Sequence, residues 1–236
     1  MAAPRWAARQ DWRYRSFFSL NLNPGGKLFE VGCGSGIFLG LATERGYQVS
    51  GIDHDPSAIE TAHQLYGIAN VQVSSVEEFL STECPGYFDV ICIFDVLEHL
   101  QDPLSIVKGL GGQLVDDGYL VCTVPSHQRW PQWFAPDVDI PPHHLTLWSE
   151  LALKQCFINA GLEPLEVRPS PLMGETLLHQ ASLRWRALQR LDALGAALRG
   201  IGHFIVMPVA ARFLSLAKKA GGFTLLGIAR RQTNAG

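Results

Sequence analysis

The sequence predicts an α/β fold with a doubly wound, mostly parallel sheet, and three observations support this prediction. Short apolar runs alternate with stretches of helical spacing over the first part of the chain, which is typical of βαβ units. The segment Phe88–Phe94 is apolar after Asp89, as expected of a strand that is buried on both faces. A glycine-rich turn at Gly32–Gly36 lies between the first expected strand and the first expected helix.

Local signals set the boundaries of the expected elements. Pro56 stands at the first position of a helix, where its missing N–H costs nothing. Ser149 is expected to cap a helix, Gly161 to end it, and Asp117-Gly118 to form a turn. Strands are expected at Lys27–Val31, Gln48–Asp53, Val71–Ser74, Phe88–Phe94, Tyr119–Val124, Leu162–Val167 and Phe223–Ala229. Helices are expected at Ile37–Arg45, Pro56–Leu65, Val76–Ser81, Leu104–Val115 and from Ser149 to Ala160, and helical spacing recurs in Thr176–Arg199 and Ile201–Lys219.

Composition and charge indicate which classes of protein the chain can belong to. Hydrophobic residues make up 47% of the 236 residues and charged residues 17%, which is typical of a globular chain with a sizeable core. A net charge of -3 gives no reason to expect nucleic acid as a partner. The five cysteines form no CxxC pair, which argues against a disulfide framework and favours a reducing, cytoplasmic location. Neither Met1–Trp12 nor Phe204–Ala211 has the apolar length of a secretory signal or a spanning helix.

The stretch Glu30–Gly36, EVGCGSG, and the acid that follows it predict a particular kind of ligand. Glycines let the chain bend sharply and let a ligand approach the backbone, and the helix beginning near Gly36 directs free N–H groups at the same place. Ile37 stands where the G-x-G-x-x-G dinucleotide fingerprint needs its third glycine. Asp53 ends the next expected strand, where a carboxylate can accept both hydroxyls of a ribose. The sequence therefore predicts a ligand with a ribose and less emphasis on a pyrophosphate.

Four segments in order resemble the motifs of the class I S-adenosylmethionine-dependent methyltransferases, in their small-molecule and ubiquinone-biosynthesis-like branch. These segments are LFEVGCGSGIFL followed by VSGIDHDPSAIETA, FDVICIFDVLEHLQDP, DDGYLVCTVPS, and PPHHLTLWSELALKQCFINAGL. The resemblance covers roughly Gly25 to Val167 and a closing strand at Phe223–Ala229. It implies a Rossmann-like sheet of seven strands, with the last strand antiparallel and inserted beside the sixth, and a helical insertion before that last strand.

The same resemblance implies S-adenosylmethionine as the cofactor and S-adenosylhomocysteine as its product. The glycines would pass under the methionine part, Glu30 would orient the loop or face the ammonium group, and Asp53 would hold the ribose. Other residues would border the adenine or line the rim beside the methionine, where Glu98 also lies. The residues implied around the cofactor are Glu30, Gly32, Cys33, Gly34, Gly36, Asp53, His54, Ser75, Val76, Glu77, Phe94, Asp95, Leu97 and His99.

Two histidines in the long loop after the fifth expected strand are the candidates for catalysis. An oxygen or nitrogen acceptor must lose a proton, and a neutral imidazole is a suitable base near pH 7. His143 and His144 are expected in this role, with capping or packing against the next helix as the alternative. No metal is expected, because no carboxylate stands at helical ligand spacing beside them. The loop also has aromatic residues suited to an aromatic or lipid-like small-molecule acceptor, namely Trp130, Trp133, Phe134 and Trp148.

The chain is expected to divide into four parts. Residues 1–24 would form an N-terminal helical lid, 25–170 the core that binds S-adenosylmethionine, 171–222 a helical insertion or cap, and 223–236 the final strand and tail. In the lid, Arg13, Tyr14 or Arg15 could meet the carboxylate of the cofactor. Between residues 174 and 219, seven basic residues stand against two acidic ones. This stretch could cap the acceptor pocket, form a dimer, contact an anionic membrane or be a solvated hairpin.

The sequence as a whole predicts an S-adenosylmethionine-dependent methyltransferase that acts on a small molecule, with oxygen as the expected acceptor atom and nitrogen and carbon left open. Two alternatives stay open. A nicotinamide-dependent oxidoreductase is disfavoured by Ile37, and a non-catalytic binding module on the cofactor fold is disfavoured by the intact glycine turn and Asp53. The Asn-Pro-Pro-aromatic motif of base-methylating enzymes is absent, since the fourth expected strand is followed by Asp95-Val96-Leu97-Glu98.

Overall fold

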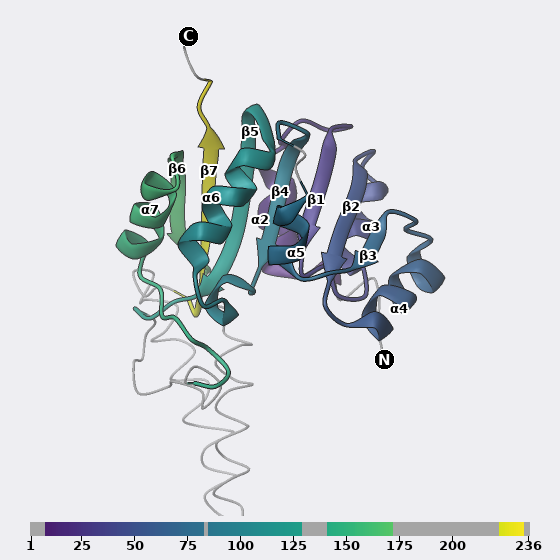
Figure 1. Cartoon of the computed structure of the whole chain (residues 1–236), viewed down its shortest axis with the longest axis horizontal. Coiled ribbons are helices and arrows are strands. Elements are labelled where there is room, and N and C mark those ends of the chain that lie inside the picture. Colours follow the sequence, from purple (N-terminus) through teal and green to yellow (C-terminus); the bar gives the residue numbers. More distant parts are fainter. Residues whose placement is uncertain (1–7, 83–84, 129–140, 172–221, 234–236) are drawn as a thin grey trace, which may run out of the picture.

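The computed structural model describes residues 8–82, 85–128, 141–171 and 222–233, which are built around one seven-stranded sheet (Figure 1). The strand order is β3-β2-β1-β4-β5-β7-β6. Neighbouring strands among β1 to β5 are parallel, whereas β7 runs antiparallel to both β5 and β6. The predicted fold class, with its antiparallel last strand beside the sixth, is confirmed. The strands are β1 (Lys27–Val31), β2 (Gln48–Asp53), β3 (Val71–Val73), β4 (Phe88–Phe94), β5 (Leu114–Pro125), β6 (Leu162–Pro169) and β7 (Thr224–Arg231).

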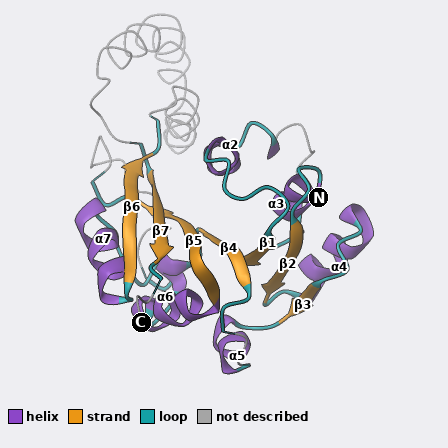
Figure 2. Cartoon of the chain, turned by 90° about the horizontal axis from the view of Figure 1, so that it is seen from above, coloured by secondary structure: helices purple, strands orange, loops and turns teal. Residues whose placement is uncertain are grey.

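Helices cover both faces of this sheet (Figure 2). On one face, α2, α3 and α4 contribute to a buried cluster that includes Phe17, Phe38 and Ile59. On the other face, α5, α6 and α7 contribute to a second cluster that includes Val107 and Phe157. The central strands supply side chains to both clusters, which explains why they are continuously apolar. The helices are α2 (Trp12–Ser19), α3 (Ile37–Thr43), α4 (Pro56–Tyr66), α5 (Val76–Ser81), α6 (Pro103–Gln113) and α7 (Glu150–Asn159), and η1 (Leu97–His99) is a short 3-10 turn.

Each described α-helix other than α3 begins at a residue whose side chain caps it. Asp55 accepts a hydrogen bond from the backbone of Ser57 and caps α4, just ahead of Pro56. Ser149 caps α7, as its sequence position predicts. Such caps satisfy N–H groups that have no partner within the helix. Local chemistry therefore determines the helix starts that follow β2 and precede β6.

The start of β5 differs from its prediction. The sequence predicts a turn at Asp117-Gly118 that separates a helix from a strand. Strand pairing already begins at Leu114, which lies opposite Phe88 of β4, and α6 ends one residue earlier. The register then shifts, and Asp117 adopts a φ of 59°. The predicted turn is wrong because the Asp-Gly pair accommodates an irregularity within one long strand.

The strand order places the glycine turn at the point where the sheet changes direction. From β1 the chain proceeds outward to β2 and β3, and it then returns to β4 on the other side of β1. Ligands of open α/β sheets bind at such switch points, outside the carboxyl ends of the strands. Gly32 and Cys33 both donate to the carbonyl of Ile52 at 2.9 Å, which fastens the turn to the end of β2.

Some predicted features lie outside the described residues. They are the helical insertion apart from its ends, the basic stretch 174–219, and the loop aromatics Trp130, Trp133 and Phe134. Within the described ranges, no helix has both the length and the apolar character needed to cross a bilayer.

Candidate functional site

The glycine turn and Asp53 are bonded directly to each other. The N–H of Gly34 donates to Oδ2 of Asp53 at 2.8 Å, and the N–H of Asp55 donates to Oδ1 at 2.9 Å. Asp53 ends β2 and is only 9% exposed. A carboxylate offers about four lone-pair positions. The two backbone bonds therefore fix its orientation and leave capacity for the hydroxyl groups of a ligand.

The three glycines of the turn differ in what surrounds them, although all have positive φ angles. A Cβ on Gly32 would lie 2.5 Å from Cγ2 of Val96, and one on Gly36 would lie 2.8 Å from Cβ of Ala62. A Cβ on Gly34 would meet no described atom within 4 Å. Gly32 and Gly36 thus allow close packing, whereas the backbone of Gly34 faces open space that a ligand can enter.

Glu30 lies in β1, just before the turn, and is 3% exposed. Its Oε2 has no hydrogen-bond partner among the described residues. Burial raises the pKa of Glu30 well above its usual range, with Arg13 opposing this shift and Asp53 adding to it. A buried carboxyl oxygen without a partner is unfavourable unless a donor or a cation reaches it. The position therefore suits a cationic group of a ligand.

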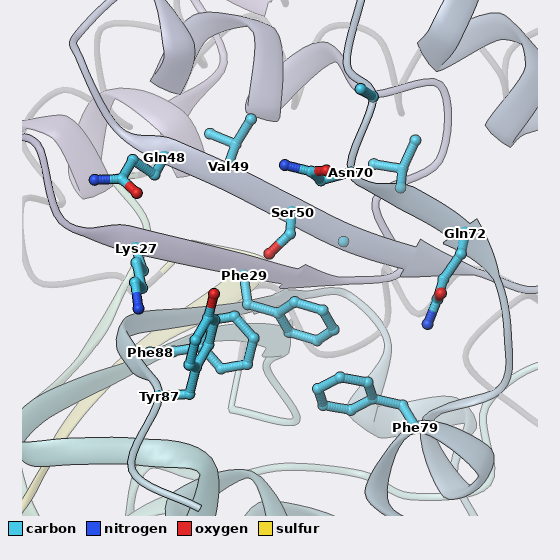
Figure 3. Close-up of a pocket in the computed structure, with 13 residues that line it drawn as sticks. Lys27, Phe29, Gln48, Val49, Ser50, Asn70, Gln72, Phe79, Tyr87 and Phe88 are labelled. Atoms are coloured by element: carbon cyan, nitrogen blue, oxygen red, sulfur yellow. The ribbon is translucent and has the colours of Figure 1, made fainter. Parts of the chain in front are cut away.

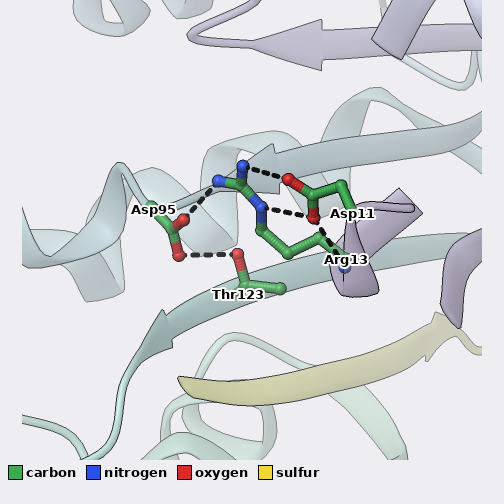
Figure 4. Close-up of polar contacts among 4 residues, drawn as sticks. All are labelled: Asp11, Arg13, Asp95 and Thr123. Atoms are coloured by element: carbon green, nitrogen blue, oxygen red, sulfur yellow. Dashed lines mark hydrogen bonds and ion pairs between the residues drawn. The ribbon is translucent and has the colours of Figure 1, made fainter. Parts of the chain in front are cut away.

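Arg13 joins the N-terminal helix α2 to the end of β4 (Figure 4). Its Nη1 donates to Oδ2 of Asp95 at 2.5 Å, and its Nη2 donates to Oδ2 of Asp11 at 2.7 Å. Oγ1 of Thr123 donates to the other oxygen of Asp95 at 2.8 Å. The sequence suggests Arg13 as a partner for the carboxylate of a ligand, but in this structure it contacts two carboxylates of the protein.

Several residues predicted around the cofactor have side chains committed to the fold. Cys33, Val76 and Leu97 are between 0% and 6% exposed and belong to the two core clusters. The ring of Phe94 packs against aromatic neighbours in the core beneath α2 and α3. Ser75 caps α5 through its hydroxyl. At these positions the backbone, rather than the side chain, is what a ligand can contact.

Three other predicted residues are placed differently. The side chain of His54 is 92% exposed, and its Nδ1 lies 3.5 Å from Oδ1 of Asp53. Glu77 is exposed in the first turn of α5. Trp148 is expected to line an acceptor pocket, but it is 6% exposed and packs in the larger core cluster. Because its ring fills part of the core under α7, Trp148 does not line an open pocket.

The structure brings one of the two candidate histidines to the end of β4. Glu98, His99 and His144 each present a donor atom, and these atoms lie within 4.8 Å of one another. The ring centroids of His99 and His144 are 4.9 Å apart. His143 has an exposed side chain and contributes its backbone carbonyl, which lies 2.6 Å from Nδ1 of His99. Of the two candidates, His144 is therefore the member of this cluster.

The cluster lies next to the network that Arg13 forms. Burial raises the pKa of Glu98 to about 8, and the charges of Asp95 and Arg13 act on it in opposite directions. Glu98 is 1% exposed although it follows β4 by only a few residues. Acidic and imidazole groups thus meet at the same edge of the sheet as the glycine turn and Asp53.

Sequence reasoning misses two residues of this region and underestimates a third. Thr123 lies opposite Phe94 in the pairing of β4 with β5, and a lone polar residue near the end of an apolar strand is a signal that could have identified it. Asp11 caps α2 and holds Arg13. Glu98 is expected only at the rim, because its proximity to His144, within 4.8 Å, joins segments far apart in the sequence.

A groove of about 500 Å³ lies along β1, β2 and β3, next to Phe79 of α5 (Figure 3). It is lined by Lys27 and Gln48, at the amino ends of β1 and β2, and by Tyr87. Nζ of Lys27 lies 3.7 Å from the centroid of the Tyr87 ring. Gly34 and Asp53 do not line it, so this groove is separate from the candidate site.

The fold and the site together define the class of the protein. A glycine turn bonded to an acid one strand away, at the switch point of a seven-stranded sheet with an antiparallel last strand, is the arrangement of the class I S-adenosylmethionine-dependent methyltransferases. The family model described as a methyltransferase domain matches residues 5–167. The chain therefore belongs to the methyltransferase domain family. The predicted class is confirmed, and the nicotinamide oxidoreductase is set aside.

Comparison with known proteins identifies relatives that are similar in sequence and a solved structure that is similar in fold. The ubiquinone biosynthesis O-methyltransferase of Xanthomonas campestris pv. campestris (strain B100) is 37% identical over 116 residues, which are 48% of this chain and 47% of that protein. The protein of the same name from Pseudomonas fluorescens (strain Pf0-1) is 39% identical over 87 residues, or 36% and 38% of the two chains. The match spans less than half the length of these curated relatives. A SAM dependent methyltransferase from Archaeoglobus fulgidus shares the fold, with a TM-score of 0.66 at 17% identity over 97% of this chain and 95% of that one.

S-adenosylmethionine is the cofactor of this class, and the residues present fit it. The unpartnered oxygen of Glu30 suits its ammonium group. The open backbone at Gly34 leaves room for its methionine part, and Asp53 keeps lone pairs for its ribose.

Replacing Asp53 with alanine is expected to weaken the binding of S-adenosylmethionine by about 1–3 kcal/mol, which is the range for lost charge-assisted hydrogen bonds. Calorimetric titration measures this change. Asp55→Ala is the matched control, since it removes a neighbouring carboxylate whose oxygen caps α4. The control should bind the cofactor like the wild type. An unchanged affinity in Asp53→Ala would show that the ribose is held elsewhere.

Proposed function

We propose that this chain transfers the methyl group of S-adenosylmethionine to an oxygen of a small-molecule acceptor. The observation that carries the proposal is the cluster of Glu98, His99 and His144, which lies at the same edge of the sheet as the turn held by Gly34 and Asp53. Imidazole and carboxyl groups are suited to take the proton of a hydroxyl. The names of the curated relatives, which specify O-methylation, support oxygen as the acceptor atom.

The residues of the turn would hold and orient the cofactor. Asp53 would accept the ribose hydroxyls, Glu30 would face the ammonium group, and the backbone of Gly34 would lie against the methionine part. The acceptor oxygen then attacks the methyl carbon in line with sulfur, the carbon–sulfur bond breaks, and its electron pair remains on sulfur. Alignment of the two reactants can supply much of the acceleration. In this assignment, the main contribution of the protein to the reaction is to align the cofactor and the acceptor.

The acceptor hydroxyl must also lose its proton, and we assign this event to the cluster at the end of β4. His144 is half-buried beside Glu98 and His99, whereas the side chain of His143 is exposed. Glu98 is buried and His144 half-buried, so a proton acceptor there is partly shielded from bulk water. We therefore place the catalytic role on His144 and not on His143.

The N-terminal segment 1–24 is proposed to act as a lid on the 25–170 core. Its helix α2 is joined to the end of β4 through Arg13 and Asp95. The ring of Tyr14 also lies 5.2 Å from that of Phe38 in α3. These contacts place the helix next to the carboxyl end of β4, where the acceptor and the cofactor would meet.

The test uses S-adenosylmethionine that carries ¹³C in its methyl group. The enzyme is incubated with this cofactor and a panel of phenols, catechols, alcohols and amines, and the product is analysed by two-dimensional NMR. The proposal predicts an O–CH₃ signal and one equivalent of S-adenosylhomocysteine per methyl ether. Label on nitrogen or carbon would contradict the choice of oxygen. No product with any acceptor, despite tight cofactor binding, would favour a non-catalytic module.

A further inference from the structure

The cluster of Glu98, His99 and His144 has the composition of a metal site as well as that of a proton acceptor. One donor atom of each residue lies within 4.8 Å of the other two. Two of the residues come from η1, directly after β4, and the third comes from the loop before α7. Small rotations of these side chains would bring all three donors to a single ion, whose bonds to nitrogen and oxygen are about 2.0–2.2 Å long.

Backbone hydrogen bonds hold the two segments of the cluster together. The carbonyl of Glu98 accepts from the N–H of Leu145 at 2.7 Å and from the N–H of Thr146 at 3.2 Å. The carbonyl oxygen of His143 accepts a hydrogen bond from Nδ1 of His99 at 2.6 Å. The three side chains therefore meet because the main chain brings them together, and their arrangement does not depend on a ligand.

The hydrogen bond of His99 also orients its ring for metal binding. A carbonyl oxygen can only accept, so Nδ1 of His99 carries the proton, and in the neutral ring Nε2 carries the free lone pair. Histidines that bind metals commonly donate their second ring N–H to a backbone carbonyl or a carboxylate in this way. His99 thus has the outer contact that such a ligand requires.

Glu98 provides the second indication. The residue is 1% exposed, and within the described part of the chain its Oε2 has no hydrogen-bond partner. A buried carboxylate oxygen is unfavourable unless a donor or a cation satisfies it. A cation held between Glu98 and the two imidazoles would satisfy it directly.

We propose that Glu98, His99 and His144 bind a divalent transition-metal ion, with Zn²⁺ as the best match. Two imidazoles and one carboxylate are a usual ligand set of sites that have three protein ligands and an open position. Mg²⁺ and Ca²⁺ prefer oxygen ligands and should bind less well. This proposal revises the expectation of no metal, which considered only the residues beside His143 and His144 in the sequence.

The open position would take the hydroxyl oxygen of the acceptor, and this part rests on the proposed function. A bound divalent cation lowers the pKa of an oxygen ligand, so the hydroxyl releases its proton to water near neutral pH. The resulting oxygen anion would then be held next to the cofactor. With the metal bound, His144 would be a ligand and not the proton acceptor, and the cluster would still be the part of the site that causes the hydroxyl to lose its proton.

The test measures metal binding without reference to activity. Tag-free protein, stripped with a chelator and dialysed, is titrated with Zn²⁺ by calorimetry and with Co²⁺ by visible absorption. The proposal predicts one equivalent of Zn²⁺ and a Co²⁺ spectrum of low coordination number. Glu98→Gln and His144→Ala should each weaken Zn²⁺ binding by at least about tenfold, given that even outer-shell partners contribute about 10–100-fold. His63→Ala, which removes an imidazole of α4 outside the cluster, should bind as the wild type does.

The outcomes separate this proposal from the proposed function. Wild-type affinity for Zn²⁺ in both variants would overturn the metal site, and His144→Ala decides alone if Glu98→Gln does not fold. Zn²⁺ bound by the wild type and lost in the variants supports the site even if no methyl ether is ever formed. Full methyl transfer by the stripped enzyme in the presence of a chelator would overturn the role of the metal and leave the methyltransferase assignment intact.

Discussion

Replacement of His144 with alanine is expected to lower kcat for methyl transfer by about 10²–10⁴-fold, which is the range that positioned proton transfer contributes. The expectation follows from the place of His144 beside Glu98 and His99 at the end of β4. The affinity for S-adenosylmethionine should stay unchanged, because His144 is not among the residues assigned to the cofactor. Steady-state kinetics and calorimetry on the same preparation measure both quantities.

His143→Ala is the matched comparison for this prediction. It removes an adjacent imidazole of the same kind, but its side chain is exposed and only its backbone carbonyl contacts the cluster. The effect of His144→Ala on kcat should therefore exceed that of His143→Ala by at least about tenfold. Equal loss in the two variants, or full activity in both, would show that the cluster does not take the proton.

The second large effect is expected for Gly34→Ala. A Cβ at this position would meet no protein atom within 4 Å, so the substitution fits the fold apart from the cost of a positive φ in a non-glycine residue, about 1–2 kcal/mol. The new methyl group would occupy the space in which the methionine part of the cofactor is proposed to lie. The affinity for S-adenosylmethionine should fall by about 100-fold, or about 2.7 kcal/mol.

Gly161→Ala separates the backbone strain from the steric effect. Gly161 has a φ of 80°, and its Cβ would also meet nothing within 4 Å, but it lies between α7 and β6 and not in the glycine turn. Thermal unfolding should show a similar loss of stability in the two variants. Only Gly34→Ala should lose cofactor affinity, and equal affinity in both variants would mean that no ligand passes close to Gly34.

Much of the fold could be predicted because the signals are local. The continuous apolar run of β4, the cap of α4 and the glycine turn each depend on neighbours in the sequence. The irregular start of β5 could not be predicted, because Asp117-Gly118 has the composition of a free turn and only the pairing with β4 extends the strand beyond it. The antiparallel direction of β7 can be predicted only from the resemblance to a family, since no local pattern indicates strand direction.

The candidate site divides in the same way. Gly34 and Asp53 could be predicted to meet because they end adjacent strands of a parallel sheet. The pairing of Arg13 with Asp95 and the proximity of Glu98 to His144 depend on tertiary packing, with Arg13 and Asp95 far apart in the sequence. Spacing rules for metal ligands on one helix do not detect such a set. The sequence gives no reason to choose between His143 and His144, because their different exposure depends on how the loop packs.

The central claim is that the backbone at Gly34 and the carboxylate of Asp53 hold opposite parts of one cofactor. A crystal structure of the protein with bound S-adenosylhomocysteine is the most direct test of this claim. We expect the ribose hydroxyls within hydrogen-bond distance of Asp53 and the amino-acid part of the ligand against Gly34. A ligand bound in the groove beside Lys27, or a ribose turned away from Asp53, would contradict the account.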